Sequence, residues 1–429
     1  MMDYSKKLRE VLNEGYFPFP IQMDGINWMM THHYCILGDE PGVGKTIQAI
    51  STIALAGGKA ICVVPSSLKV NWKDEFEKFS TLEADIIATG VDARKCNFNK
   101  DIIICSYGLF AKLPYKVLSQ AKTIAFDEAH YLCNPEAQRT QVAHEIIETH
   151  LPERVLLLSG TPVKNRVGEY FSLLAMCSYN PKGTSGADLS ETYSDFYKFQ
   201  ETFSYKEEFS INRRKITRFE GTRNIPLLKT LLRGKYKRRT LDQVAEIPEM
   251  MHIPVSLDMK MHDEEMYEEF LKGESSVSGN KAKSALAKAD STGDYVNDLL
   301  KTVDAVIVFT DHVQSAIDIS KRIKGSECIT GSTSTDKRAA LVKRLQSGSI
   351  DCLVCTIGSM STGHTLTRAR DVVFNDLSWV EADNEQARRR IRRVSQKAKT
   401  RAHYMEGSKV CKMIRKTLSR KINNLKEIV

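Results

Sequence analysis

The sequence has no apolar run that approaches the roughly 20 residues of a membrane-spanning helix. Residues 1–6, MMDYSK, lack the apolar core of a secretion signal. Internal repeats and a long low-complexity tail are missing as well. These absences argue against a membrane protein, a secreted protein and a repeat array, and we expect a protein that stays inside the cell.

Cysteine does not form the pattern of a metal site. Most of the ten cysteines lie in short apolar runs, such as ICV at 61–63, where a reduced thiol behaves as a small core side chain. Cys352 and Cys355 have the spacing of a zinc-binding pair, but residues three apart in a strand point to opposite faces. No second pair accompanies them, and we therefore predict no zinc site.

A strong charge of one sign is also missing. The 62 basic and 53 acidic residues leave a net charge of +9, which favours polyanions only mildly. With 429 residues, of which 42% are hydrophobic, the chain is long enough for two or three domains with substantial cores.

The segment EPGVGKT at 40–46 follows the apolar run CIL at 35–37 and resembles a phosphate-binding loop. Gly42 and Gly44 let the backbone turn tightly and direct amide hydrogens at a β-phosphate, in front of the positive end of the following helix. An isolated match of this kind could also be an ordinary glycine-rich turn. Two further segments argue against that alternative.

The side chains of this loop have expected roles in binding ATP. Lys45 is expected to contact the β- and γ-phosphate oxygens, and Thr46 to bind Mg²⁺. The strict form of the pattern has glycine where this chain has Asp39.

The first supporting segment is an acidic pair. Asp127 and Glu128 follow TIAF at 123–126, a run whose β-branched and aromatic residues predict a buried strand. Asp127 would hold Mg²⁺ directly or through water, and Glu128 would orient and deprotonate the attacking water. Their place at a strand end, after a phosphate loop, argues against a solvated pair of surface charges.

The second supporting segment is the basic block QARRRIRRVSQ at 386–396. Arg390 and Arg393 are three apart, so they would share one helical face and could both point at a γ-phosphate held by another lobe. For the remaining arginines we adopt the ordinary interpretation, a basic helix that faces solvent or nucleic acid: Arg388, Arg389 and Arg392.

Short apolar runs alternate with helical stretches, which is typical of parallel sheets covered by helices. The predicted strands of a first sheet are 61–64, 102–105, 124–126 and 155–158, and those of a second sheet are 306–309, 353–355 and 372–374. Between about 177 and 246 the strand signals stop, and charged segments with aromatic residues predict a helical insertion.

Two segments of the second half leave alternatives open. Residues 272–292, rich in Lys, Ser, Ala and Gly, predict either a mobile loop or a helix with few anchoring contacts. Residues 408–429 place apolar side chains on one helical stripe. We favour a C-terminal helix packed on a lobe with its lysines in water over a DNA-binding helix.

The order of these segments resembles superfamily-two helicases and, within them, the Swi/Snf family of DNA-dependent ATPases. The match covers nearly the whole chain, Asp39 is also what the family shows, and the block KRRT at 237–240 is the most family-specific segment. The resemblance implies an α/β fold with two RecA-like lobes. They are an ATP-binding lobe 1 at 1–176, a helical insertion and linker at 177–246, and a C-terminal helicase lobe 2 at 247–429.

The resemblance also implies roles for single residues. FPIQMDGINW at 19–28 resembles the family's opening motif, in which the glutamine binds adenine, here Gln22. LSGTP at 158–162 resembles the motif that links hydrolysis to DNA contact, through Ser159 and Thr161 and together with Gln386 of the arginine block. Contacts to the DNA backbone are implied for five residues: Ser67, Ser106, Tyr107, Ser332 and Thr362.

The function implied by the resemblance is that of an ATP- and Mg²⁺-dependent double-stranded DNA translocase that binds DNA without sequence preference and acts as a monomer. Remodelling of forked or branched DNA, by strand displacement or branch migration, is the expected task. A chain with almost no appended domains resembles the compact translocases of bacteria and phages. The expected location is the cytoplasm of a bacterium or phage-infected cell, or the nucleus if the source is eukaryotic.

Two other classes of protein stay open. An RNA helicase shares the same ATPase parts, and only Trp28, Trp72 and the 237–240 block favour duplex DNA through the resemblance. A non-catalytic nucleic-acid-binding scaffold would ordinarily have lost Lys45, Glu128 or a finger arginine, and all are present.

Overall fold

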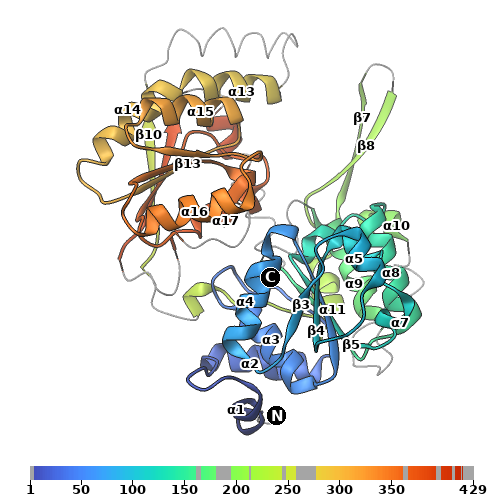
Figure 1. The fold of residues 1–429 in the computed structure, drawn as a ribbon. Coiled ribbons are helices and arrows are strands. Elements are labelled where there is room, and N and C mark those ends of the chain that lie inside the picture. The colour runs from blue at the N-terminus through green and yellow to red at the C-terminus, as the bar shows by residue number, and fades with distance from the viewer. Residues whose placement is uncertain are drawn as a thin grey trace. The chain divides into compact units, whose positions relative to one another are not determined.

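The computed structural model of this protein describes residues 4–160, 166–179, 195–211, 214–243, 248–257, 277–360, 366–392, 398–407, 411–416 and 418. The described residues up to 243 belong to one compact unit and those from 248 onward to a second (Figure 1). Each unit is built on a parallel sheet covered by helices, so the predicted α/β fold with two lobes is confirmed. The domain boundaries at 176/177 and 246/247 stay predictions.

The first unit contains a seven-stranded sheet in the order β3-β4-β2-β5-β6-β1-β9, in which every neighbouring pair is parallel. Side chains of β2 alternate between two apolar clusters, with Ile61 and Val63 in one and Cys62 and Val64 in the other. Both faces of the sheet are therefore buried, as is usual for parallel strands. Its strands are β1 (Tyr34–Leu37), β2 (Lys59–Val64), β3 (Ala84–Ile86), β4 (Ile102–Ser106), β5 (Ala121–Asp127), β6 (Arg154–Leu158) and β9 (Tyr236–Lys237).

Helices lie on both faces of this sheet (Figure 1). They are α1 (Ser5–Val11), α2 (Pro20–Thr31), α3 (Lys45–Ala56), α4 (Lys69–Phe79), α5 (Gly90–Lys95), α6 (Tyr107–Phe110), α7 (Tyr115–Leu118), α8 (Gln138–His150) and α9 (Tyr170–Ser178). Short 3₁₀ turns are η1 (Ser66–Leu68), η2 (Ala129–Leu132), η3 (Val167–Glu169) and η5 (Leu241–Gln243).

The segment predicted to be a helical insertion contains α10 (Phe196–Phe203) and α11 (Ile225–Leu232), but the expectation that strands stop there is wrong. β7 (Tyr205–Ile211) and β8 (Arg214–Glu220) form an antiparallel hairpin that extends from the body of the first unit (Figure 1). Charged residues face each other across it, as in the pair Glu207 and Arg218. Because these strands are mostly polar, the sequence carries no apolar run to mark them.

The second unit contains a six-stranded sheet in the order β10-β15-β14-β11-β13-β12, again parallel throughout. Cys352 and Cys355 belong to different apolar clusters, so they lie on opposite faces of their strand as predicted. The strands are β10 (Met251–Ser256), β11 (Val306–Thr310), β12 (Glu327–Ile329), β13 (Cys352–Thr356), β14 (Asp371–Phe374) and β15 (Arg401–Glu406). The helices are α13 (Val277–Ala287), α14 (Ala289–Leu299), α15 (Val313–Arg322), α16 (Thr335–Gln346) and α17 (Glu381–Arg388), with the 3₁₀ turn η6 (Ile357–Met360).

The part of 272–292 that the structure describes is helical and well anchored, which corrects the expectation of a loose segment. The side chain of Lys288 is 1% exposed, and its ammonium donates to the main-chain oxygens of Asn375 and Met405, the latter at 2.9 Å. Lys281 forms an ion pair with Asp311. Two lysines thus act as buried anchors, which a composition-based expectation cannot anticipate.

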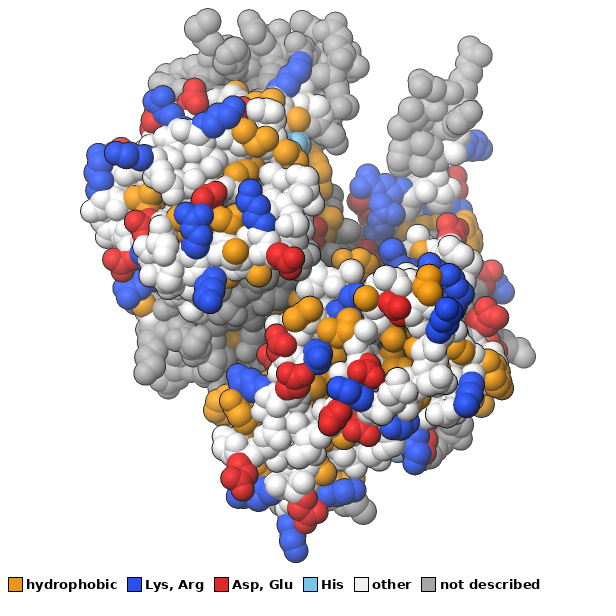
Figure 2. Space-filling model, in the orientation of Figure 1, with side chains coloured by type: hydrophobic (Ala, Val, Ile, Leu, Met, Phe, Trp, Pro, Cys, Tyr) orange, Lys and Arg blue, Asp and Glu red, His pale blue; other side chains and the backbone are white. Residues whose placement is uncertain are grey.

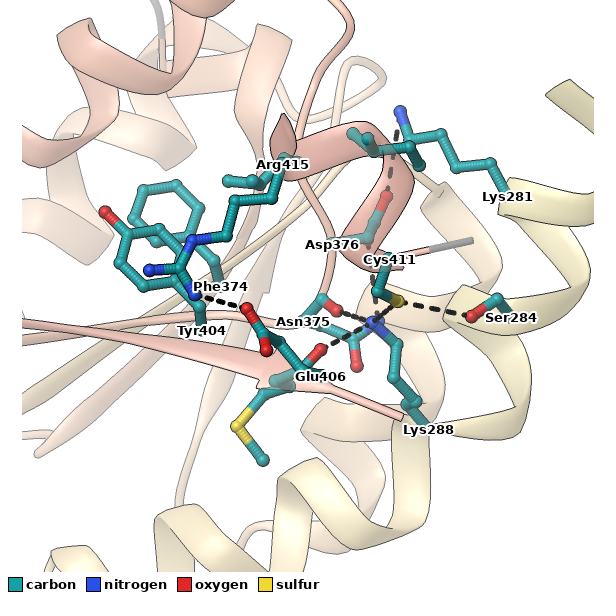
Figure 3. A pocket seen from close by; sticks show the side chains of 13 residues that line it. Lys281, Ser284, Lys288, Phe374, Asn375, Asp376, Tyr404, Glu406, Cys411 and Arg415 are labelled. Atoms are coloured by element: carbon teal, nitrogen blue, oxygen red, sulfur yellow. Dashed lines mark hydrogen bonds and ion pairs between the residues drawn. The ribbon is translucent and has the colours of Figure 1, made fainter. Parts of the chain in front are cut away.

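Figure 3 shows Lys288 and Ser284 pointing toward Cys411 at a small cavity in the second unit. The Lys288 Nζ lies 3.2 Å from the Cys411 Sγ. The cavity measures about 30 Å³, room for one or two waters and too small for a nucleotide.

Residues 411–416 are helical, and Ile414 and Leu418 are buried beside Leu377 and Trp379. This packing supports the docked helix, although the rest of 408–429 lies outside the described residues. Among the described residues, no helix is long and apolar enough to cross a membrane.

Candidate nucleotide site

The carboxyl ends of β1, β5 and β6 bring the predicted ATP-binding segments to one edge of the first sheet. Leu158, the last residue of β6, is in register with both Leu37 of β1 and Asp127 of β5. The phosphate loop follows Leu37, and Ser159 follows Leu158. Loops at the carboxyl edge of a parallel sheet are where such folds bind ligands.

The backbone of the loop has the left-handed conformation that glycine permits, with φ of 100° at Gly42 and 94° at Gly44. Gly44 is the residue before α3, and a Cβ atom at this position would also collide with the side chain of Gln22. The N-terminal turn of α3, whose amides have no acceptor within the helix itself, follows this loop directly, which is where such folds bind an anion.

Lys45 begins α3, and its Nζ donates to the main-chain oxygen of Asp39 at 2.8 Å. Thr46 follows in the same turn. The ammonium also lies close enough to Asp127 to lower the pKa of that carboxyl, which places the lysine between the loop and the acidic strand end.

Gln22 lies against the loop from α2. Its Nε2 donates to the Val43 main-chain oxygen at 2.9 Å, and its Oε1 accepts from the Phe19 amide at 3.0 Å. The side chain is 7% exposed. The side-chain amide of Gln22 is thus held next to the loop.

Asp127 is buried at the end of β5 and receives hydrogen bonds from two directions. The Trp72 Nε1 donates to one carboxylate oxygen at 2.8 Å and the Glu128 amide donates to the other at 2.9 Å. Burial, followed by the charge of Glu128, raises the pKa of Asp127 to about 6, although Trp72 and Lys45 act in the opposite direction. Two adjacent carboxyls in a buried place are a setting that a cation would stabilise.

Glu128 has a left-handed backbone, with φ of 52°, which is uncommon outside glycine and concentrated at functional sites. The His130 Nδ1 lies 3.2 Å from the Glu128 Oε2 and 3.2 Å from the Ser159 Oγ. One imidazole therefore connects the acidic pair to the segment that begins at Ser159.

The donor set suits Mg²⁺ bound mainly through phosphate. No group of three or more His, Cys, Asp or Glu side chains that could hold a metal ion occurs among the described residues. Mg²⁺ in nucleotide sites is typically held by one or two carboxylates together with substrate phosphates. Asp127 and the Thr46 hydroxyl match that requirement.

The predicted DNA-contacting residues of the first unit lie at the same sheet edge. Val64 and Ser106 are in register at the ends of β2 and β4, and Ser67 lies in η1 just beyond β2. Tyr107 has an internal partner, since its hydroxyl donates to the Asp127 main-chain oxygen at 2.7 Å. The structure thus gives Tyr107 a supporting contact at the acidic pair, and its DNA contact stays a prediction.

In the second unit, the arginine block departs from the expected helix. α17 ends at Arg388, so Arg390 lies in the following turn rather than on a helical face. Arg390 and Gln386 are each 6% exposed. Ser332 follows β12, and its hydroxyl lies 2.9 Å from that of Thr330. Three candidates lie outside the described residues: Thr161, Thr362 and Arg393.

Arg388 and Arg389 are buried, which corrects the interpretation of a solvent-facing basic helix. Arg388 pairs with Glu381 and Glu385, and Arg389 pairs with Glu385. Burial alone would raise the pKa of Glu385, but the two guanidinium groups hold that pKa far below its ordinary value. Acidic residues one and two turns earlier in α17 therefore neutralise these arginines internally. Arg392 donates to the Pro248 main-chain oxygen at 3.3 Å.

Three contributors to the nucleotide site were not predicted as such: Trp72, His130 and Arg239. The indole of Trp72 and the imidazole of His130 contact the acidic pair. His130 lies two residues after Glu128, a local signal that was available. The contacts of Trp72 and Arg239 span 55 and 200 positions of the chain, and local pattern carries no sign of them.

The visible surface of each unit carries basic and acidic side chains interspersed (Figure 2). No broad area of one sign stands out among the described residues on this face. On this face, a contact to a nucleic acid backbone would then depend on local groups at loops and helix starts.

Two family models match this chain. The family model of the SNF2-related domain matches residues 21–305, and that of the helicase conserved C-terminal domain matches residues 291–395. Two RecA-like lobes, with the predicted phosphate loop on the first, define the class of protein as helicase-like. The chain belongs to the SNF2-related family, which confirms the predicted resemblance.

Curated relatives are similar over most of this chain. The SWI/SNF-related matrix-associated actin-dependent regulator of chromatin subfamily A-like protein 1 of Xenopus laevis is 27% identical over 90% of this chain and 41% of its own length. The human DNA annealing helicase and endonuclease ZRANB3 is 26% identical over 90% of this chain and 38% of its own length. The chain thus spans less than half the length of these relatives.

One solved structure, the Sulfolobus solfataricus SWI2/SNF2 ATPase core in complex with dsDNA, is 20% identical. The comparison covers 96% of this chain and 93% of that one, with a TM-score of 0.44.

Proposed function

We propose that this protein is a DNA-dependent ATPase that translocates on double-stranded DNA and remodels forked or branched DNA. The observation that carries the proposal is the convergence of Lys45, Asp127 and Glu128 at one sheet edge of a chain that belongs to the SNF2-related family. The charge on Lys45 and the left-handed backbone of Glu128 suit a site prepared for phosphoryl transfer.

The first unit would bind the nucleotide. The amides of the loop and Lys45 contact the phosphates, Thr46 and Asp127 hold Mg²⁺, and Gln22 contacts adenine. Bound Mg²⁺ neutralises charge on the phosphates. Glu128 accepts a proton from the attacking water, and His130 keeps its carboxylate oriented. Arg390 and Arg393 of the second unit supply positive charge to the γ-phosphate in the transition state.

Coupling to DNA would begin at Ser159. Its hydroxyl shares the His130 imidazole with Glu128, so a shift of the segment that starts at Ser159 changes the orientation of the water-activating carboxylate. Thr161 and Gln386 belong to the same proposed coupling. Contacts from Ser67, Ser106, Tyr107, Ser332 and Thr362 to DNA phosphates would transmit the state of the nucleotide to the nucleic acid without base readout.

The remodelling of branched DNA is supported by the relatives' names. One similar protein is named a DNA annealing helicase and endonuclease, and annealing is the pairing of complementary strands. We propose the same class of reaction here, in an intracellular protein that acts as a monomer.

The deciding experiment measures the rate of ATP hydrolysis with duplex, single-stranded, forked and RNA cofactors side by side, with and without Mg²⁺. Strong stimulation by duplex or forked DNA, and little by RNA, is expected. Stimulation mainly by RNA would identify an RNA helicase instead. Binding of DNA without any hydrolysis would identify a scaffold.

A further inference from the structure

The side chain of Arg239 is buried against the phosphate loop, although Asp39 and Arg239 lie 200 positions apart in the chain. The Arg239 Nε and main-chain amide each donate to the Asp39 Oδ1 at 3.0 Å, and Nη2 donates to Oδ2. The Asp39 carboxylate is 0% exposed. This is a two-pronged, fully enclosed ion pair, a geometry that the planar guanidinium makes and an ammonium cannot.

The remaining donors of Arg239 connect the loop to its two neighbouring helices. Nη2 donates to the Gln48 Oε1 of α3 at 2.7 Å, and Nη1 donates to the Asp24 carboxylate of α2 at 3.1 Å. Gln48 in turn donates to the Asp39 Oδ2 at 3.1 Å. Arg239 thus links Asp39 of the loop to Asp24 of α2 and to Gln48 of α3.

Gly25 of α2 leaves the space that this arrangement requires. A Cβ atom at position 25 would collide with the side chains of Gln48 and Arg239. Glycine in a helix interior costs about 1 kcal/mol relative to alanine. Its presence here is therefore explained by the room that the guanidinium occupies.

The main chain around Arg239 also holds the loop. The Glu40 amide donates to the Arg239 main-chain oxygen at 3.0 Å, and the Leu241 amide donates to the Glu40 carboxylate at 2.9 Å. Arg238 adds an ion pair to Glu40 at 3.3 Å. Asp39 and Glu40, two consecutive residues of the loop, are consequently both bound by residues 238–241, the segment that continues along the chain toward the second unit.

These contacts extend to Lys45, the lysine that would bind phosphate. Asp39 is held through its side chain by Arg239, while its main-chain oxygen accepts from the Lys45 Nζ at 2.8 Å. A rotation of the Asp39 peptide would therefore move the resting position of that ammonium. Buried ion pairs contribute little net stability, so stability alone does not explain four donors on one carboxylate.

We propose that Arg239 is a positioning residue of the nucleotide site: by fixing Asp39 it sets the conformation of the phosphate loop and of Lys45. This inference rests on the proposed function, since it assumes that the loop binds ATP. It also explains why this chain has aspartate where the strict loop pattern has glycine, because the aspartate is the receptor for Arg239.

The test compares Arg239→Lys, which keeps the charge and removes the planar fork, with Arg233→Lys, a matched change at an exposed arginine of the same segment. The affinity for a fluorescent ATP analogue is measured without DNA, together with kcat, KM and the midpoint of thermal unfolding. Arg239→Lys should weaken nucleotide affinity roughly 10- to 100-fold. DNA binding should stay close to that of Arg233→Lys. The unfolding midpoint should fall because buried hydrogen bonds are lost, but the variant should stay folded at the assay temperature.

A second comparison separates positioning from folding. Asp39→Gly with Arg239→Leu removes both members of the pair and restores the glycine of the strict loop pattern. The loss of nucleotide-binding free energy in this double variant should be smaller than the sum of the losses in Asp39→Gly and in Arg239→Leu. Additive losses would overturn the proposal, as would an unchanged affinity in folded Arg239→Lys or a loss that follows unfolding alone.

The two proposals fail in different ways. A wild-type protein that binds the ATP analogue without DNA-stimulated hydrolysis would contradict the proposed function. The affinity measurements on Arg239 variants would still decide the positioning role.

Discussion

Glu128 adopts a left-handed backbone directly after the buried strand β5, and such a conformation costs on the order of 1–3 kcal/mol for a residue other than glycine. The surrounding contacts hold it there: its amide donates to Asp127, and His130 lies 3.2 Å from its carboxylate. A carboxylate on a strained backbone beside the phosphate loop is the arrangement expected of a group that orients an attacking water.

Glu128→Gln should lower DNA-stimulated ATP hydrolysis by at least about 100-fold while ATP binding persists, because the amide cannot accept the proton. Lys45→Ala should abolish hydrolysis and weaken ATP binding, since the phosphate contact is lost. Rates and nucleotide affinities of the two variants check both statements. Glu136→Gln, the same change at an exposed glutamate, is the control and should behave as wild type. Near-normal turnover in Glu128→Gln would remove its assigned role.

Arg390→Ala should lower kcat roughly 1,000-fold with little change in ATP affinity, because its charge is needed only as negative charge develops in the transition state. Steady-state kinetics with saturating DNA measure this. Arg322→Ala, at an exposed arginine that pairs with Asp294 at 2.7 Å, is the matched control in the same unit. An equal loss in both variants would mean that positive charge in general, and not this position, matters.

Arg389→Ala is not a neutral control for Arg390→Ala. The structure buries Arg389 against Glu385, so its removal leaves a half-buried carboxylate with one fewer partner. This variant should lower the thermal unfolding midpoint, and the folded fraction should retain its kcat. A loss of kcat without a loss of stability would place Arg389 with Arg390 in the chemistry.

The places of candidate site residues were predictable where the motif is local in sequence, and their roles stay predictions. Residue type and spacing alone predict phosphate binding at Gly42 to Thr46 and metal binding at the pair Asp127 and Glu128. Arg239 does not, because its partner is reached only when β9 pairs with β1. The burial of Arg388 was missed for a similar reason: basic residues in a row indicate solvent until the acidic residues that neutralise them are placed.

Among the helices and strands, α13 and α14 show how buried charges hold an element. Lys288, at the junction between them, donates to main-chain oxygens at the ends of two strands, β14 and β15, through Asn375 and Met405 (Figure 3). Strand ends leave carbonyl groups without ladder partners, and a buried lysine that donates to them replaces water.

Lys288→Met should destabilise the second unit by about 1–3 kcal/mol, because two buried carbonyl oxygens lose their donor while the side chain keeps its length. Thermal or denaturant unfolding measures the change. Lys283→Met, at an exposed lysine of α13, is the control and should have little effect. Equal stability of the two variants would show that water takes over the role of the amine.

Apolar strands were predicted and polar ones were not. The runs at 61–64, 102–105, 124–126 and 155–158 all lie within strands of the first sheet, since burial on both faces imposes a continuous apolar sequence. β7 and β8 escaped because a hairpin that extends from the unit needs no such run. β9 was too short, with two residues, to carry any pattern.

For the chain as a whole, binding to duplex DNA should be insensitive to sequence and should weaken steeply with salt. The net charge is only +9, and the proposed contacts come from strand ends and helix starts that meet phosphates. Titration of binding against salt on two unrelated duplexes checks this. A strong preference for one of them would indicate base readout and contradict this prediction.

The last prediction concerns the kind of DNA on which translocation does work. A motor that pulls one duplex arm through a branch point loses base pairs on that arm and regains them on another, so the net cost is near zero. Separation of a blunt duplex has no such compensation, at about 1.4 kcal/mol per base-pair step. The protein should therefore displace a strand at synthetic forks or migrate four-way junctions in an ATP-dependent gel assay, and should fail on long blunt duplexes. Glu128→Gln in the same assay should yield no product. If the wild-type protein hydrolyses ATP and yet processes none of the branched substrates, the motor only tracks along duplex DNA, and the remodelling role is wrong.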